Sequence, residues 1–147
     1  MNGKEVADTQ KVDSSELGYD TWIVPFEAGK IEAVAENVHH VLETVNVPVQ
    51  IQLEEAGCED IVQLELTVLD DMGRRVISDQ SEIHVAIEGD CEYLGMDNGD
   101  AADVTEYRSH YRHCLEGKMM IYLRKLSDEK VKVTASNPKL RKAQIEV

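Results

Sequence analysis

Hydrophobic and polar residues alternate with a period of two in six segments between residues 49 and 147. Such alternation is typical of a β-strand with one face in a core and the other in solvent. The apolar positions are Val49, Ile51 and Leu53; Val62, Leu64, Leu66 and Val68; Ile83, Val85 and Ile87; Met119, Ile121 and Leu123; Val131, Val133 and Ala135; and Ala143, Ile145 and Val147. Short strands at this spacing predict an all-β fold, an antiparallel β-sandwich.

The segments between these strands differ in character. Residues 119–124 are apolar on both faces, which predicts a central strand. Residues 70–73 and the pair Asn137-Pro138 have turn composition. Residues 101–112 are polar and have neither a strand nor a helix period, so we expect a surface loop there.

Two interpretations are open for residues 29–46. Ile31, Val34, Val38 and Val41 fall at helical spacing, with glutamates on the opposite face, so the period taken alone favours an amphipathic helix. The same residues can also form two strands, 31–35 and 41–45, around a loop at 37–40. The resemblance described below favours the hairpin, and we therefore predict two strands with His39 and His40 in an exposed loop.

The composition limits the partners and the location of the protein. A formal net charge of −14 repels phosphate groups, so we expect neither nucleic acid nor an anionic membrane surface as a partner. No apolar run approaches the roughly 20 residues of a membrane helix, and residues 1–5 contain no apolar core of an export signal. The compartment of the protein therefore stays unknown at this stage.

The chemistry-bearing side chains give no pattern for a metal, a cofactor or a nucleophile. Cys58, Cys91 and Cys114 are odd in number and widely spaced, which argues against a disulfide framework. Cys91 and Cys114 lie in strand-like segments, where we expect small buried side chains. Adjacent histidines at 39 and 40 would point to opposite faces of a strand, so shared zinc coordination is not expected. We predict no metal site and no cofactor.

The sequence Asp97-Asn98-Gly99-Asp100 is the strongest turn signal in the chain. Asn and Gly tolerate the positive φ of a type I′ turn, and short carboxylates bond to nearby amides. A calcium site would use Asp97, Asp100 and Asp103, but Gly99 stands where the EF-hand pattern has an oxygen ligand. We therefore predict a structural turn formed by Asp97, Asn98, Gly99 and Asp100.

Several motifs follow one another in an order that is found in one enzyme family. They are Asn2-Gly3-Lys4, Trp22-Ile23-Val24-Pro25-Phe26-Glu27-Ala28-Gly29, Ile31-Glu32-Ala33-Val34-Ala35, Asp70-Asp71-Met72-Gly73-Arg74-Arg75-Val76, residues 97–100, Glu106, and Leu115-Glu116-Gly117. Together they resemble the C-terminal immunoglobulin-like region of bacterial glycoside hydrolase family two enzymes, the β-galactosidase group. Trp22 belongs to a structural strand in that pattern, so we expect it to be packed.

The resemblance implies an organisation and a role. We expect part of one immunoglobulin-like module at 1–47 and a C-terminal immunoglobulin-like β-sandwich at 48–147. The parent enzymes are retaining glycosidases, which need two carboxyl groups about 5 Å apart on a barrel of roughly 250 residues. Because a chain of 147 residues cannot hold that barrel, no residue is assigned a catalytic role.

The resemblance also implies which partners the chain has. We expect a non-catalytic fragment of a β-galactosidase-type hydrolase that packs on the other domains of the parent glycosidase in carbohydrate degradation. The alternative is an independent carbohydrate-binding or cell-surface adhesion module. A contact surface is predicted in the polar loop at Tyr107, Arg108, Tyr111 and Arg112, where aromatic and cationic side chains gather. Whether another domain or a glycan meets this surface is open.

Overall fold

The fold contains β-strands and no helix among the described residues. A computed structural model describes residues 1–6, 11, 12, 19–35, 37–57 and 61–147. Within these residues the chain forms twelve strands, which confirms the all-β prediction. It divides into two compact units, Met1–Thr44 and Val45–Val147. Each unit is described by itself below.

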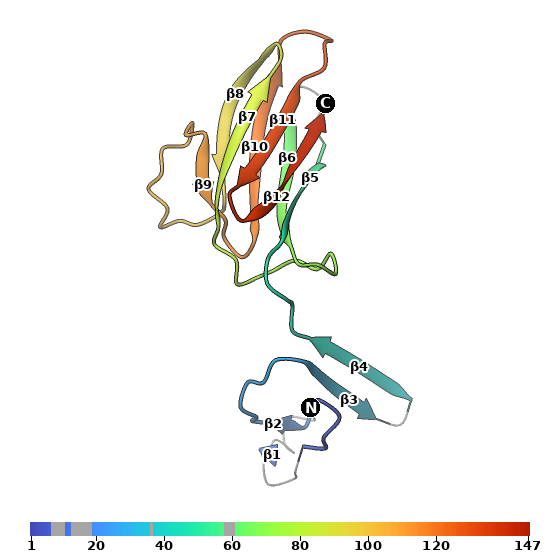
Figure 1. The fold of residues 1–147 in the computed structure, drawn as a ribbon. Coiled ribbons are helices and arrows are strands. Elements are labelled where there is room, and N and C mark those ends of the chain that lie inside the picture. Colours follow the sequence, from blue (N-terminus) through green and yellow to red (C-terminus); the bar gives the residue numbers. More distant parts are fainter. Residues whose placement is uncertain (7–10, 13–18, 36, 58–60) are drawn as a thin grey trace. The chain divides into compact units, whose positions relative to one another are not determined.

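The second unit contains a sheet of four antiparallel strands (Figure 1). Its spatial order is β8 (Cys91–Asp97), β10 (Lys118–Lys125), β6 (Val62–Leu69) and β5 (Gln50–Glu55). β10 lies between β8 and β6, with Ile121 opposite Met96 on one side and Leu64 on the other. The prediction of a central strand at 119–124 is therefore confirmed.

A second four-stranded sheet completes this unit. Its order is β12 (Leu140–Glu146), β11 (Lys132–Asn137), β7 (Glu82–Glu88) and β9 (Tyr111–His113), all antiparallel. The two sheets are joined at one side, where β12 and β5 run parallel and Arg141 is opposite Gln50. The other side is linked by a backbone hydrogen bond from Met96 of β8 to Tyr107, which belongs to the connection toward β9.

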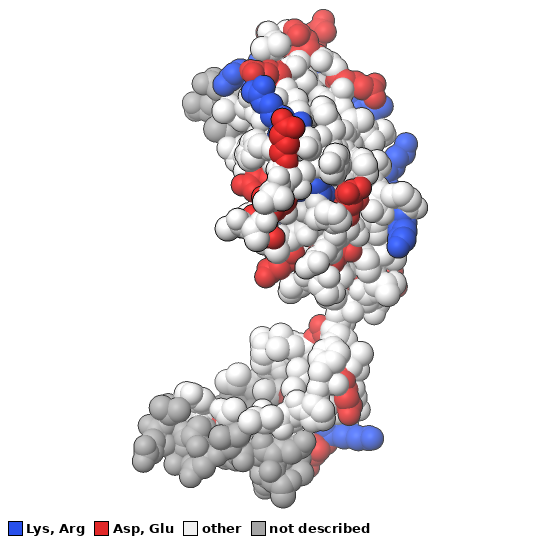
Figure 2. All heavy atoms as spheres, turned by 90° about the vertical axis from the view of Figure 1, so that its left-hand side faces the viewer, with Lys and Arg blue, Asp and Glu red and all other residues white. Residues whose placement is uncertain are grey.

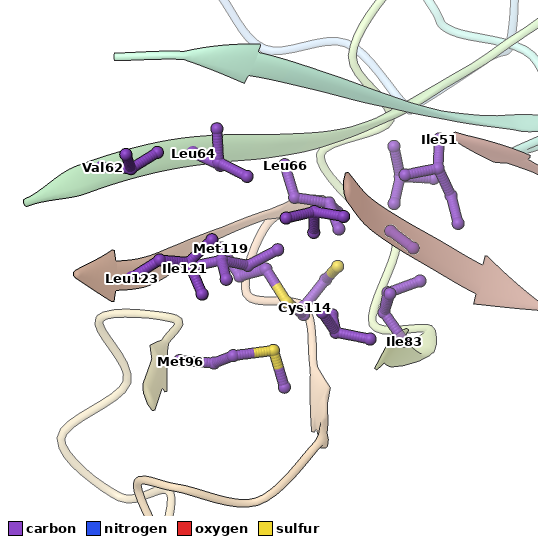
Figure 3. Close-up of a cluster of buried hydrophobic side chains, with 14 of the residues drawn as sticks. Ile51, Val62, Leu64, Leu66, Ile83, Met96, Cys114, Met119, Ile121 and Leu123 are labelled. Atoms are coloured by element: carbon purple, nitrogen blue, oxygen red, sulfur yellow. The ribbon is translucent and has the colours of Figure 1, made fainter. Parts of the chain in front are cut away.

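An aliphatic core fills the space between the two sheets. Figure 3 shows part of it, with Leu64 and Leu66 of β6 close to Met119 and Ile121 of β10. Ile83 of β7 contributes from the other sheet and is fully buried. The apolar positions of the alternating segments supply most of this core, as the period of two predicts.

The six predicted strands correspond to β5, β6, β7, β10, β11 and β12. Two further strands of the sandwich, β8 and β9, were not among the predictions. In β8 the alternation is broken by a bulge, because Tyr122 is opposite Gly95 while Leu123 is opposite Tyr93. β9 has only three residues, too few to show a period.

Asp70 fixes the turn after β6 and is fully buried. Its carboxylate accepts hydrogen bonds from the backbone amides of Asn46, Met72 and Arg74, and from Nε of Arg74. Burial alone would raise the pKa of this carboxyl, but these hydrogen bonds hold the pKa well below its ordinary value. The turn therefore folds around one ionised side chain.

The first unit contains two pairs of strands, β1 (Lys11–Val12) with β2 (Thr21–Trp22), and β3 (Lys30–Ala35) with β4 (Val38–Glu43). β3 and β4 form an antiparallel hairpin, so the strand interpretation of residues 29–46 is confirmed. The predicted loop at 37–40 is wrong, because β4 begins at Val38. His39 and His40 therefore lie within a strand and are exposed.

The hairpin is amphipathic across its two faces. Ile31 is opposite Leu42, and Ala35 is opposite Val38, so the side chains of both pairs share one face. That face is exposed within this unit, as Leu42 and Val38 are 59% and 67% accessible. Trp22 of β2 is 43% accessible, so the expectation that it is packed is wrong in this unit.

Candidate functional site

The connection between β8 and β9 brings together most of the residues singled out from the sequence. It begins with the turn at 97–100, which is held by side chains that bond to amides two residues ahead. Asp97 accepts from Gly99, Asn98 from Asp100, and Asp100 from Ala102, each at 2.9 Å. Gly99 has a φ of 77°. These bonds form successive Asx turns along the start of the loop.

The type I′ geometry lies at a different place from the one predicted. Asn98 is not among the described residues with positive φ, and the chain after Asp97 crosses to the other sheet instead of returning beside β8. Glu116 and Gly117 have φ values of 52° and 70°, and Leu115 and Lys118 exchange backbone hydrogen bonds around them. The tight turn between two strands is therefore at Glu116-Gly117, between β9 and β10.

Arg112 holds the loop from inside and is only 4% exposed. Its Nη1 lies 2.6 Å from Oδ2 of Asp103, and its Nη2 donates to the carbonyl oxygens of Thr105 and Glu106. Hydrogen bonds from Thr105 and the guanidinium of Arg112 lower the pKa of Asp103 to about 2. Arg112 therefore does not belong to an exposed contact surface, as the sequence analysis placed it, because its charge is used within the loop.

Tyr107 folds back onto the edge strand β8. A Cβ atom built on Gly95 would lie 2.3 Å from Cδ1 of Tyr107, so the ring occupies the space that a side chain at this position would need. The backbone oxygen of Tyr107 accepts a hydrogen bond from Met96 at 2.9 Å. The neighbouring Arg108 is 3.6 Å from Glu92, also on β8. Tyr107 and Arg108 thus lie over the outer side of the β8 sheet.

Tyr111 lies on the other sheet. It is in β9, directly opposite His84 of β7, and the two ring centroids are 5.9 Å apart. Tyr111 is 47% exposed and Tyr107 is 50% exposed. The four predicted contact residues therefore do not form one surface. Tyr107 and Arg108 lie over β8, Tyr111 lies on β9 in the other sheet, and Arg112 is buried.

A residue missed by the sequence analysis, Tyr122, lies beside Tyr107. The two rings are nearly parallel, with 16° between their planes and 6.5 Å between their centroids. Tyr122 is in the predicted strand β10, and its position between the core residues Ile121 and Leu123 directs it to the outer face. The alternation of this strand was the signal that could have identified it.

The remaining titratable residues form no metal-binding cluster of three His, Cys, Asp or Glu side chains in the part of the chain that the structure describes. Cys91 and Cys114 are free thiols, and burial, with the nearby charge of Asp79, raises the pKa of Cys114 to about 12. Cys58 lies outside the described residues. The described residues include no helix long and apolar enough to cross a membrane.

Known structures share this fold. A glycosyl hydrolase family 2 member from Bacteroides cellulosilyticus DSM 14838 has a TM-score of 0.78 at 22% identity, covering 92% of this chain and 20% of that one. A β-glycosidase from Bacteroides vulgatus has a TM-score of 0.71 at 22% identity, covering 88% and 19%. A β-glucuronidase from Parabacteroides merdae has a TM-score of 0.59 at 17% identity, covering 86% and 17%. This chain thus spans at most a fifth of these proteins.

The sequence comparisons agree with the structural ones. No curated protein matches the chain. A family model described as glycoside hydrolase family 2 C-terminal domain 5 matches residues 46–146, which include every strand of the β-sandwich. The resemblance identified from the sequence motifs is therefore confirmed. The chain belongs to the glycoside hydrolase family 2 C-terminal domain 5 family.

Proposed function

We propose that the chain is a non-catalytic accessory region of a retaining β-galactosidase-type glycosidase. The observation that carries this proposal is the family match over the whole β-sandwich, combined with a length that is too short for a catalytic barrel of about 250 residues. The related solved proteins are several times longer than this chain, which supports a role as one part of a larger enzyme.

The domain organisation belongs to the same proposal. Residues 1–47 would form part of an immunoglobulin-like module and residues 48–147 the complete sandwich. The apolar face of the β3–β4 hairpin, with Ile31 and Leu42, is exposed. This supports an incomplete module, because a sheet with one apolar face normally buries that face against another element of the same module.

Contact with other domains of the parent would use the exposed edge at β9. Tyr111 is half exposed on this short edge strand, and the loop before it is fixed by the Arg112–Asp103 pair. A rigid loop loses little conformational entropy when it meets another domain, which favours such a contact.

Sequencing of the coding region upstream of residue 1 in the source genome tests the accessory role. A reading frame that runs continuously from a (β/α)8 barrel into this chain supports the proposal. A tandem array of similar sandwiches in place of the barrel supports the alternative, an independent carbohydrate-binding or adhesion module, and contradicts the proposal.

A further inference from the structure

The outer face of the β8–β10–β6–β5 sheet carries a pair of aromatic rings with no role in the core. Tyr122 of β10 is directly opposite Gly95 of β8 and Gln63 of β6. The ring of Tyr107 covers Gly95, so the missing side chain on β8 is replaced by a second tyrosine beside the first. The two rings are stacked on the outer face of the sheet; Tyr107 is half exposed and Tyr122 is partly buried.

Most neighbours of the two tyrosines are polar. Asp97 of β8 is opposite Met120 of β10, and this pair is two residues along the strands from the Gly95–Tyr122 pair, on the same outer face. Burial raises the pKa of both phenols, and the charge of Asp97, one outer position along β8 from Gly95, raises each pKa further. Gln63, Asp97 and the two phenolic hydroxyl groups can therefore exchange hydrogen bonds with a ligand lying on the rings.

Three cationic side chains of this face are paired with carboxylates. Arg124 is 2.7 Å from Glu92, Arg108 is 3.6 Å from the same carboxylate, and Lys118 is 2.7 Å from Glu65. Figure 2 shows acidic and basic side chains interspersed over the displayed face of the second unit. The net charge of −14 for the whole chain also disfavours an anionic ligand.

The chemistry of the face distinguishes between classes of ligand. A stable protein interface has a desolvated apolar centre, whereas the outer positions here are polar apart from the rings and Met120. Aromatic rings flanked by hydrogen-bonding groups suit the apolar C–H face and the hydroxyl edge of a pyranose sugar. We infer that Tyr107 and Tyr122 form a binding platform for a chain of neutral pyranose sugars.

This platform adds a function to the accessory role and does not depend on which glycoside the parent enzyme cleaves. It would hold a neutral polysaccharide on the module while other parts of the enzyme act on it. Because the platform lies on the outer face of one sheet, it is separate from Tyr111 of β9 on the other sheet.

Native gel electrophoresis of the full chain in gels containing a soluble polysaccharide tests the inference. Galactan, xylan and mixed-linkage β-glucan are the neutral probes, and polygalacturonate is the anionic probe. We expect at least one neutral polysaccharide to slow migration and polygalacturonate to have no such effect. If none of the three neutral polysaccharides slows the chain, as for a surface that contacts only protein, the inference is wrong.

Variants locate the binding surface. Tyr122→Ala should weaken binding by about tenfold through loss of one stacking ring, while Tyr122→Phe should retain most of it. Tyr111→Ala is the matched control, because Tyr111 is as exposed as Tyr107 but lies on the other sheet. Equal retardation of Tyr122→Ala and the parent chain overturns the assignment.

A second readout is independent of the stability of the variants. Titration of the isotope-labelled parent chain with the retarding polysaccharide should shift the amide resonances of Gly95 and Tyr122 and leave that of Tyr111 in place. Shifts confined to residues outside the β8–β10–β6–β5 sheet would contradict the proposed location.

Discussion

Arg112 and Asp103 form a nearly buried ion pair, with side chains that are 4% and 12% exposed and 2.6 Å between Nη1 and Oδ2. They are nine residues apart, one in β9 and the other within the loop that precedes it. The same guanidinium also donates to two loop carbonyl oxygens, so a single side chain fixes the path of residues 103–106.

Removal of this guanidinium should destabilise the sandwich strongly. Arg112→Met removes the charge partner of Asp103 and one donor to each of two carbonyl oxygens, and we expect a loss of about 3–5 kcal/mol in the free energy of unfolding. Arg108→Met is the matched control, because Arg108 is 62% exposed and its ion pair is long, so we expect a loss below about 1 kcal/mol. Urea denaturation measures both, and equal losses would show that the buried pair has no special role.

The stability of the fold should also fall in acid. Because the folded pKa of Asp103 is about 2 and its ordinary value is 3.8, this carboxylate contributes its stabilisation fully above the ordinary value. The stabilisation is lost as the pH falls from about 4 toward 2. The melting temperature of the parent should drop over this range, and Asp103→Asn should show a smaller drop. An unchanged pH dependence in Asp103→Asn would contradict the assignment.

Asp70 should be the most sensitive acidic position in the chain. Asp70→Ala would leave three backbone amides without an acceptor, each a loss of about 1–3 kcal/mol where the donor is buried. Asp71→Ala removes one exposed hydrogen bond to Asn46 and should cost about 1 kcal/mol or less. Thermal unfolding of the two variants compares them directly, and similar melting temperatures would refute the central role of Asp70.

Two glycines with positive φ should respond differently to alanine. At Gly99 the added Cβ meets no atom within 4 Å, so Gly99→Ala costs only the strain of a φ of 77°, about 1 kcal/mol. At Gly95 the Cβ also meets the ring of Tyr107 at 2.3 Å, which should add about 1–3 kcal/mol. Circular dichroism melts of both variants test the ranking, and a less stable Gly99→Ala would contradict the close packing of Tyr107 on Gly95.

Much of the fold could be predicted because half-buried strands carry their own period. Six strands followed from the alternation, while β8 did not, since Gly95 and the bulge beside it interrupt the pattern. The helical spacing of Ile31, Val34, Val38 and Val41 was misleading in the β3–β4 hairpin. Cross-strand pairing places Ile31 and Val38 on one face and Val34 and Val41 on the other, which a helical projection of the sequence cannot show.

The candidate site was less accessible to sequence reasoning, because its residues act through contacts that are remote along the chain. Arg112 is in a polar segment of the sequence that is typical of a surface loop. In the fold, however, its side chain is buried and pairs with Asp103, nine residues earlier in the chain. The aromatic surface joins Tyr107 of a loop to Tyr122 of a strand, across a glycine on a third element. No local pattern records such a juxtaposition.

The most direct test of the accessory role is an activity measurement on the purified chain of residues 1–147. With 4-nitrophenyl β-galactoside and β-glucuronide as substrates, we expect no hydrolysis above that of an identically purified sample from cells lacking the gene. The physical reason is that a retaining glycosidase needs two carboxyl groups about 5 Å apart on a barrel of roughly 250 residues, and this chain of 147 residues is too short for that barrel. Turnover that persists after contaminating host enzyme is removed would contradict the account.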